Sequence, residues 1–216
     1  MTISKAQAGL LALGVLVILV LIILYRSEKF VTINGFGYYV GDAEKAKTLA
    51  KINRTAIKVI EVLRNRLEKE HKIRGMVNGG AIDEITYLRL KDMYENLRWR
   101  YNPDGLKETV AWAIAPDVTS YTWKKGEVLS MCLEYDKQTE TWPVLFTVLI
   151  HELTHMSTKV EQHPPEFWTR YKLLVDTVRE SGMTKTLKLP KTAMVHCGSV
   201  RISRREMERL KSPAAW

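Results

Sequence analysis

The sequence has few cysteines, prolines and glycines, and each scarcity excludes a class of protein. Two cysteines among 216 residues, Cys132 and Cys197, exclude a disulfide-dense scaffold and allow at most one bridge. Seven prolines and twelve glycines exclude collagen-like and linker-type compositions. With 46% hydrophobic and 26% charged residues, the chain is not wholly disordered, and its length fits one domain with or without an appendage.

The N-terminus departs most from average composition. No charged residue and no proline occurs from Ala8 to Tyr25, and a helix over these residues would be roughly 27 Å long, close to the hydrocarbon thickness of a bilayer. A cleaved signal peptide is disfavoured because no small-residue cleavage site follows the apolar run, and a core helix is disfavoured because no polar stripe interrupts it. The run therefore predicts a transmembrane anchor within residues 1–30, and a single-pass membrane protein.

The rest of the chain predicts a domain of the α+β class. Residues 31–41 are rich in glycine and aromatic residues, which indicates a juxtamembrane loop or a short hairpin. Residues 42–203 form the predicted main domain, and residues 204–216 a basic tail. Hydrophobic spacing and capping residues predict helices from Asp42 to about 71–75, from Asp83 to about 100, over 142–156 and over 165–180, with a hairpin over 120–133.

Positive charge is concentrated near the C-terminus. From Lys185 onward there are eight lysines and arginines against two glutamates, which supplies six of the nine excess positive charges. Such a segment could contact nucleic-acid phosphates or anionic lipid headgroups. The alternative is a solvated helix in which Glu206 and Glu208 are interleaved with the basic residues.

The segment His151-Glu152-Leu153-Thr154-His155 carries the clearest chemical signal. Two histidines four residues apart project from one face of a helix, where both imidazoles can bind one Zn²⁺. Glu152 is offset around the helix, so it can act on a water molecule without being a ligand. The apolar residues before the motif indicate a buried helix rather than two surface histidines. The pattern predicts zinc-dependent hydrolysis with Glu152 as the catalytic residue.

A catalytic zinc site needs a third protein ligand. His163 is the favoured candidate, because it stands eight residues after His155 and before two prolines, where the chain can turn back. A carboxylate on the following helix is the alternative, and the candidates are Glu166, Asp176 and Glu180. His71 and His196 are interpreted as surface or structural residues, and Cys132 as a buried strand residue.

At these residues the chain resembles the WLM and SprT-like zincin metallopeptidases. These have HExxH, a third histidine and an aromatic residue soon after it, here Glu166-Phe167-Trp168. The closer similarity is to WLM-like metallopeptidases of large eukaryotic DNA viruses. It rests on Thr119–Glu127 followed by Cys132-Leu133, on Arg100–Asp104, and on the segment His196–Ile202. The similarity covers roughly residues 44–203 and departs from the SprT-like pattern at Pro164, where those enzymes usually have glycine.

The resemblance implies a zincin fold, with His151, His155 and His163 as zinc ligands and Glu152 as the catalytic residue. It also implies an edge strand for an extended peptide substrate, for which Glu127–Leu133 is the candidate. Tyr121, Tyr135 and Tyr171 are equal candidates for the group that stabilises the oxyanion. Together these expectations describe a membrane-anchored zinc metallopeptidase in a viral, virion inner or host membrane, acting on a protein or peptide.

Two other functions are compatible with the sequence. The first is a structural role, in which residues 8–25 insert in a membrane and the zincin fold links it to capsid or other virion proteins. The retention of Glu152 argues against a purely structural role, because a scaffold does not need that carboxylate. The second is nucleic-acid binding through the basic tail, which rests on analogy with relatives that act on proteins crosslinked to DNA.

Overall fold

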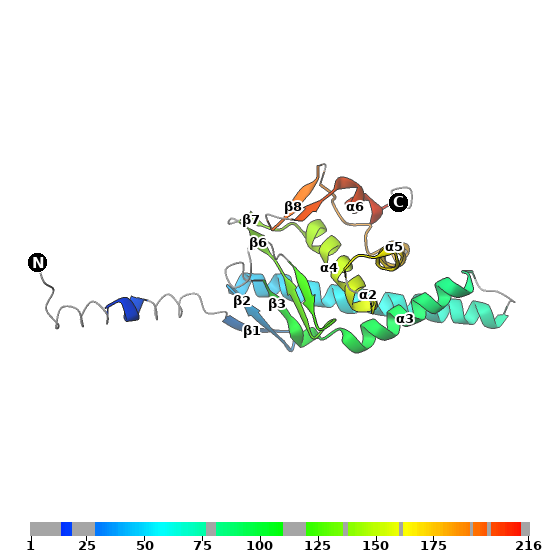
Figure 1. The fold of residues 1–216 in the computed structure, drawn as a ribbon, viewed down its shortest axis with the longest axis horizontal. Coiled ribbons are helices and arrows are strands. Elements are labelled where there is room, and N and C mark those ends of the chain that lie inside the picture. Colours follow the sequence, from blue (N-terminus) through cyan, green and yellow to red (C-terminus); the bar gives the residue numbers. More distant parts are fainter. Residues whose placement is uncertain are drawn as a thin grey trace, which may run out of the picture.

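The computed structural model of the chain describes residues 14–18, 29–76, 81–109, 120–135, 138–159, 162–190, 192–197 and 200–212. Within these ranges the fold mixes helices with a five-stranded sheet (Figure 1). The helices are α2 (Ala43–Met76), α3 (Glu84–Arg100), η1 (Pro103–Gly105), α4 (Trp142–Ser157), α5 (Pro165–Glu180) and α6 (Arg204–Arg209). The four long helices lie where the sequence predicts them, and Asp83 caps α3 by accepting a hydrogen bond from the Thr86 amide.

The main sheet has the strand order β1-β2-β3-β5-β4 and combines parallel with antiparallel neighbours. Its outer pairs β1–β2 and β4–β5 are antiparallel hairpins, whereas β3 lies parallel to both β2 and β5. Asn34 and Gly35 both have positive φ, as the tight turn between β1 and β2 requires. The strands are β1 (Lys29–Ile33), β2 (Phe36–Val40), β3 (Leu106–Glu108), β4 (Tyr121–Trp123) and β5 (Val128–Met131).

Two short hairpins complete the described strands. They are β6 (Glu134–Tyr135) with β7 (Gln138–Thr139), and β8 (Met194–His196) with β9 (Val200–Ile202). Helix α2 is central to the packing, since it contacts α3, α4 and α5 as well as strands β1 to β3 (Figure 1). Its core-facing side chains at helical spacing include Leu49, Ile52 and Leu63, and these three are fully buried. The core therefore lies between α2, the sheet and α4.

A buried polar network joins α2 to the sheet and to the end of α3. The Asn53 amide donates to the Tyr38 hydroxyl at 3.0 Å and accepts from the Tyr101 hydroxyl at 2.7 Å. Asn53 is 1% exposed, and burial raises the pKa of the Tyr101 hydroxyl above its usual range, so that group stays a neutral donor. The network satisfies polar groups that would otherwise be costly inside the core.

Replacement of Asn53 by alanine is expected to lower the free energy of unfolding by about 1–3 kcal/mol, because two buried hydroxyls lose their partner. Urea denaturation followed by circular dichroism measures the change. Thr55→Ala is the matched control, since this side chain is half-buried on the same helix and contributes no bond to the network, so stability should change by less than about 0.5 kcal/mol. Equal losses in the two variants would contradict this reading of the network.

The predicted N-terminal membrane anchor is corrected by the structure. None of the helices in the described ranges is long and apolar enough to cross a membrane. Of the predicted anchor over residues 8–25, only 14–18 are described, as a short helical stretch, and the other residues lie outside the described part. The apolar run alone was the basis for the transmembrane helix in the predicted fold class and for the single-pass location. Neither prediction is supported by a spanning helix.

Two segments have structures that composition left open. Within residues 31–41, the strands β1 and β2 form a hairpin paired over five positions. Residues 204–212 contain α6, which is capped by Ser203 and Glu206 and buries Met207.

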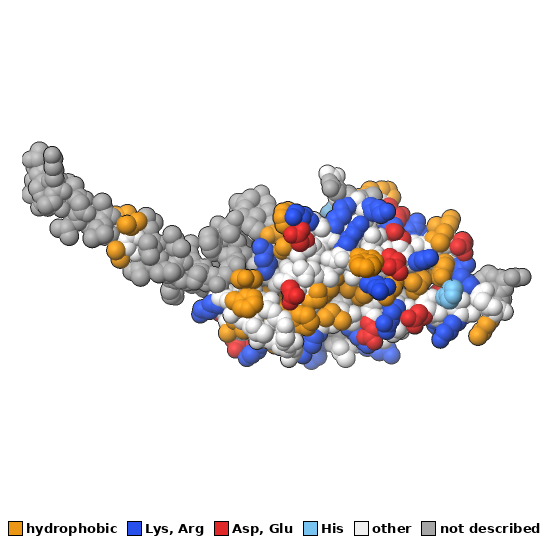
Figure 2. Space-filling view, turned by 90° about the horizontal axis from the view of Figure 1, so that it is seen from below, with side chains coloured by type: hydrophobic (Ala, Val, Ile, Leu, Met, Phe, Trp, Pro, Cys, Tyr) orange, Lys and Arg blue, Asp and Glu red, His pale blue; other side chains and the backbone are white. Residues whose placement is uncertain are grey.

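On the face shown in Figure 2, basic and acidic side chains are interspersed among apolar ones rather than separated by sign.

Candidate metal centre

Helix α4 contains the HExxH motif and is buried along most of its length. Pro143 stands in its first turn, and the residues from Val144 to Ile150 are all buried. Thr147 and Thr154 donate their hydroxyl protons to carbonyl oxygens four residues earlier, so these polar side chains are satisfied within the helix. A helix fixed on most sides in this way presents His151 and His155 in a defined direction.

The structure brings the three predicted histidines together through their Nε2 atoms. These atoms are 3.2 Å apart between His151 and His155, 3.1 Å between His155 and His163, and 2.9 Å between His151 and His163. The chain turns at Gln162, whose φ is 59°, and His163 follows directly. Pro164 has a φ of −66°, within the ordinary range for proline, so the departure from glycine at this position leaves His163 in place.

The donor set fits a zinc ion. Zn–N bonds of about 2.0–2.1 Å in a tetrahedral site place ligand nitrogens roughly 3.3 Å apart, close to the spacing of the three Nε2 atoms. Three Nε2 atoms that face one another cannot all be paired by hydrogen bonds, because in a neutral ring Nε2 is either a donor or an acceptor and two of the three must have the same role. Three nitrogen ligands also leave a fourth position open, as a catalytic zinc requires.

Aromatic side chains from α5 support this cluster. The Phe167 ring is fully buried, and its centroid lies 4.9, 4.5 and 4.7 Å from those of His151, His155 and His163. Trp168 stacks on His163 with centroids 5.7 Å apart and is 39% exposed. Phe167 therefore restricts the orientation of all three imidazoles, and Trp168 forms part of the rim.

The carboxylates considered as third ligands are engaged elsewhere. Glu166 accepts hydrogen bonds from Arg89 and Arg170. Asp176 pairs with Lys172 and Arg179, and Glu180 with Arg66. His71 contacts the Tyr87 hydroxyl at an exposed position. Among the described residues, the cluster of possible ligands around His151 and His155 is completed by His163.

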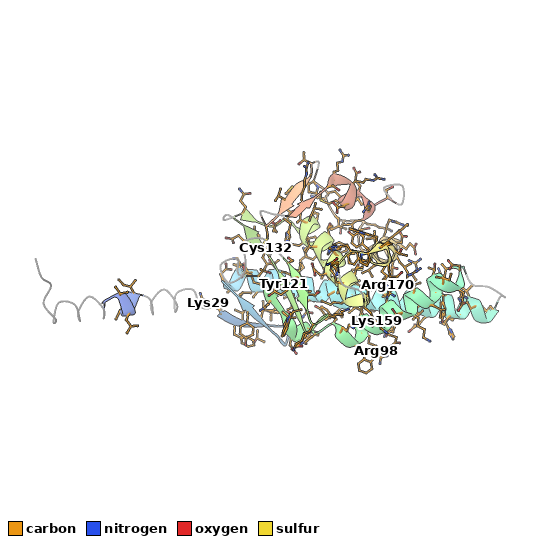
Figure 3. The ribbon with its side chains drawn as sticks, viewed as in Figure 1. Lys29, Arg98, Tyr121, Cys132, Lys159 and Arg170 are labelled. Atoms are coloured by element: carbon orange, nitrogen blue, oxygen red, sulfur yellow. A yellow bond between two sulfur atoms is a disulfide. The ribbon has the colours of Figure 1, made fainter. Side chains whose placement is uncertain are left out.

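Three side chains from other helices bind the C-terminal end of α4, next to His155. Arg100 donates to the carbonyl oxygens of Met156 at 2.9 Å and Thr158 at 2.8 Å. Asn96 and Arg170 donate to the Ser157 carbonyl oxygen at 3.1 and 2.7 Å, and Arg170, labelled on α5 in Figure 3, also binds Asp92 and Glu166. Cationic donors at these carbonyls satisfy the end of the helix and oppose its negative dipole.

Burial sets the protonation of the site. It lowers the pKa of His151 to about 3 and that of His155 to about 4, and the neighbouring imidazoles act in the same direction. Both rings are therefore neutral at neutral pH, which is the form that binds a metal. Burial raises the pKa of Glu152 to about 8, although a hydrogen bond from the Thr122 backbone opposes this rise.

The raised pKa of Glu152 predicts a pH-dependent difference in stability between the metal-free wild type and Glu152→Gln. Between about pH 4.5 and 8 the folded wild type keeps a proton that the unfolded chain has lost, so its stability falls as pH rises through this window. Glutamine is neutral throughout, so the variant lacks this loss. Urea denaturation in excess chelator at several pH values should show that the free energy of unfolding of the variant, relative to that of the wild type, increases as pH rises. A difference independent of pH would contradict the prediction.

A cavity of about 660 Å³ opens onto the three histidines and Glu152. One wall is strand β4, the outermost strand in the sheet order, where Tyr121 is labelled in Figure 3. The expected edge strand over Glu127–Leu133 corresponds to β5, which instead lies between β3 and β4. Arg201 and Ile202 of β9 also line the cavity, and so does Glu206 of α6, which belongs to the segment predicted as a basic tail.

Of the tyrosines considered for oxyanion stabilisation, Tyr121 and Tyr171 line this cavity. Burial raises the pKa of the Tyr171 hydroxyl above its usual range, so it keeps its proton. The side chain of Tyr135 lies outside the described part.

Sequence reasoning also missed the pairing of Cys132 with Cys197, which form a disulfide across 65 positions. Their even number permitted a bridge but gave no sign of it.

Comparison of the chain with protein-family models, with curated proteins and with solved structures gave no match. The resemblance to WLM and SprT-like metallopeptidases therefore stays a prediction.

Proposed function

We propose that this protein is a zinc-dependent hydrolase that cleaves peptide bonds. The observation that carries the proposal is the convergence of three histidine Nε2 atoms within 3.2 Å of one another, beside a buried glutamate in the same cavity. His151, His155 and His163 would hold the metal, and Glu152 would be the catalytic residue. No structural role requires a buried carboxylate next to three imidazoles, since burying it costs stability.

Zinc bound by the three histidines would polarise the substrate carbonyl, lower the pKa of a water molecule and favour the ionised form of Glu152. The Glu152 carboxylate accepts a proton from water as the water oxygen bonds to the peptide carbonyl carbon. It then gives that proton to the departing nitrogen as the C–N bond breaks. The Thr122 backbone N–H holds the Glu152 carboxylate by a hydrogen bond during these transfers.

The cavity suits an extended peptide. Strand β4 pairs with β5 along one edge and has no second partner among the strands described, so its outer edge can bind a substrate backbone as an added strand. Val148, Trp168 and Ile202 offer apolar surface for substrate side chains, whereas Lys124 and Lys125 add positive charge at the β4 end of the cavity. A single extended peptide can contact all three features.

The purified protein is expected to contain about one zinc ion per chain and to release new amino groups from a denatured protein such as casein. Removal of the metal by 1,10-phenanthroline should abolish this release, and added zinc should restore it. The non-chelating 1,7 isomer is the matched control. Plasma emission gives the metal content, and an amine-reactive dye follows cleavage. A protein that binds no zinc after incubation with excess zinc would contradict the proposal.

A further inference from the structure

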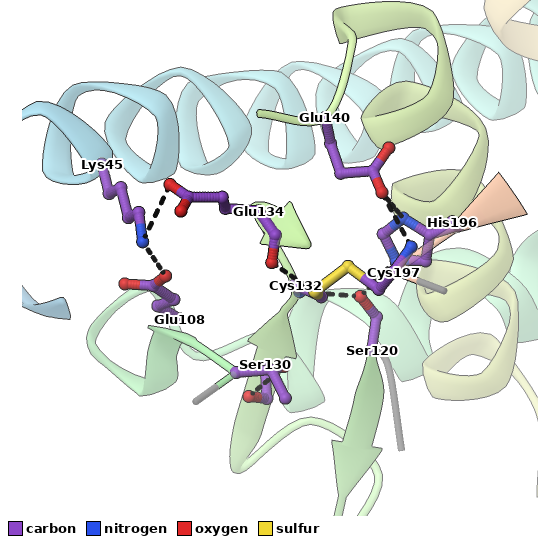
Figure 4. Close-up of a disulfide and its surroundings, with 10 residues drawn as sticks. Lys45, Glu108, Ser120, Ser130, Cys132, Glu134, Glu140, His196 and Cys197 are labelled. Carbon is purple, nitrogen blue, oxygen red and sulfur yellow. Dashed lines mark hydrogen bonds and ion pairs between the residues drawn. A yellow bond between two sulfur atoms is a disulfide. The ribbon is translucent and has the colours of Figure 1, made fainter. Parts of the chain in front are cut away.

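A second cluster of metal-ligand types lies beside the disulfide (Figure 4). Glu140 precedes α4, His196 is the last residue of strand β8, and Cys197 follows it. One ligand atom from each of these three residues lies within 4.8 Å of those of the other two. The sulfur of Cys132, which follows β5, is bonded to that of Cys197, so a fourth residue with a possible ligand atom reaches the same place.

All four side chains are buried, and one of them has an unused polar atom. His196 is 1% exposed and the Glu140 side chain 7%. The Nε2 atom of His196 is hydrogen-bonded to the Ser120 hydroxyl at 3.0 Å. Its Nδ1 atom lies 3.4 Å from Glu140 Oε1 but has no hydrogen-bond partner in the described part of the chain. A buried nitrogen that makes no hydrogen bond is uncommon in a native core, and this one faces Glu140 within the cluster.

We propose that reduction of the Cys132–Cys197 disulfide creates a second zinc site, formed by both cysteines, His196 and Glu140. A dithiol reductant supplies two electrons and two protons, so that the S–S bond breaks, both cysteines become thiols and the dithiol closes to its own disulfide. Zinc binding then releases the two thiol protons to water, because the thiolate is the ligand form. The ligand types, two sulfurs, one imidazole and one carboxylate, are those of a closed four-coordinate zinc site.

The change in geometry is small enough for side chains alone. Two thiolates on a tetrahedral zinc ion with Zn–S bonds of about 2.3 Å lie roughly 3.8 Å apart, against about 2.0 Å in a disulfide. The Cα atoms of Cys132 and Cys197 are 6.3 Å apart, so rotation about the Cα–Cβ bonds can supply the extra separation. The hydrogen bond of 2.7 Å from the Cys197 backbone N–H to Glu140 Oε1 already fixes this carboxylate.

The exchange of a disulfide for a zinc ion would keep the hairpin of β8 and β9 attached to the end of β5 in both redox states. This matters for the candidate active site because His196, Arg201 and Ile202 line its cavity from that hairpin. Disulfides persist in oxidising compartments and are reduced in the cytosol, whereas zinc–thiolate sites are stable there. The cavity wall would then be held in either environment.

The test measures metal per chain in the full-length protein, oxidised and after anaerobic reduction with a phosphine that supplies the same two electrons. We expect reduction to add about one zinc ion per chain. With cobalt(II) as the probe, the added ion should give a thiolate-to-metal charge-transfer band, which three histidines cannot produce. No added metal on reduction, or an added cobalt ion without this band, would overturn the proposal.

Variants assign the ligands. Cys132→Ser with Cys197→Ser should bind the same amount of metal in both conditions, whereas His196→Ala should weaken the added site at least about tenfold. His71→Ala, at an exposed histidine, should behave as the wild type. Because the readout is the difference between redox states, it does not depend on zinc at His151, His155 and His163. Added metal that survives the double cysteine change, in a protein with wild-type circular dichroism, would also refute the proposal.

Discussion

Replacement of Glu152 by glutamine is expected to lower the rate of peptide-bond hydrolysis by roughly 10²–10⁴-fold while the zinc content stays at the wild-type level. Glutamine keeps the size of the side chain and can still hydrogen-bond to the Thr122 backbone, but it cannot accept the proton of the attacking water. Glu152 is not one of the three residues whose nitrogens converge, so the metal should remain. Loss of activity with retained zinc would separate proton transfer from metal binding.

The control for this variant is Glu127→Gln. Glu127 lies in the turn between β4 and β5, its side chain is 53% exposed, and it pairs with Lys124. The substitution removes the same charge close to the cavity without touching the buried carboxylate, so we expect hydrolysis within about twofold of the wild type. Full activity in Glu152→Gln would exclude this residue as the proton acceptor. Loss of zinc together with activity would instead place Glu152 among the ligands.

Replacement of His163 by alanine is expected to weaken zinc binding by at least about a hundredfold. Mutation of a group that only orients a ligand already lowers metal affinity about 10–100-fold, and His163 would itself be a ligand. Competition with a fluorescent chelator measures the affinity. The choice of His163 over Glu166 is tested directly by Glu166→Gln, which should keep its zinc since this carboxylate is bound by Arg89 and Arg170. His71→Ala controls for the removal of an imidazole. The opposite ranking of His163→Ala and Glu166→Gln would identify the carboxylate as the ligand.

The parts of the site that could be predicted from sequence are those built from neighbouring residues. His151 and His155 share a face because any helix places residues four apart together. His163 follows His155 after one short loop. The alternative third ligands, Glu166, Asp176 and Glu180, could be set aside only when the structure showed them paired with basic side chains. The N-terminal ends of α4 and α5 follow from Pro143 and Pro165 in their first turns.

The parts that could not be predicted depend on residues far apart in the chain. Strand β3 has three residues and lies parallel to β2 and β5, a pairing that leaves no pattern in so short a segment. The disulfide joins residues 65 positions apart, and the cavity wall from Arg201 to Glu206 approaches the histidines only through tertiary packing. The membrane anchor was inferred from hydropathy alone, without any contact that could test it.

The binding of the end of α4 by Arg100, Asn96 and Arg170 has a consequence for motion in the site. Helix ends normally fray, and His155 stands only two residues before the last residue of α4. If the last turn unwound, the distance between the two imidazoles of the motif would fluctuate and the metal would dissociate faster. With these carbonyls held by α3 and α5, amide exchange in the last turn requires the separation of three helices rather than the opening of one end. A metal ion held by these two imidazoles would then have a residence time set by the cooperative stability of the domain core.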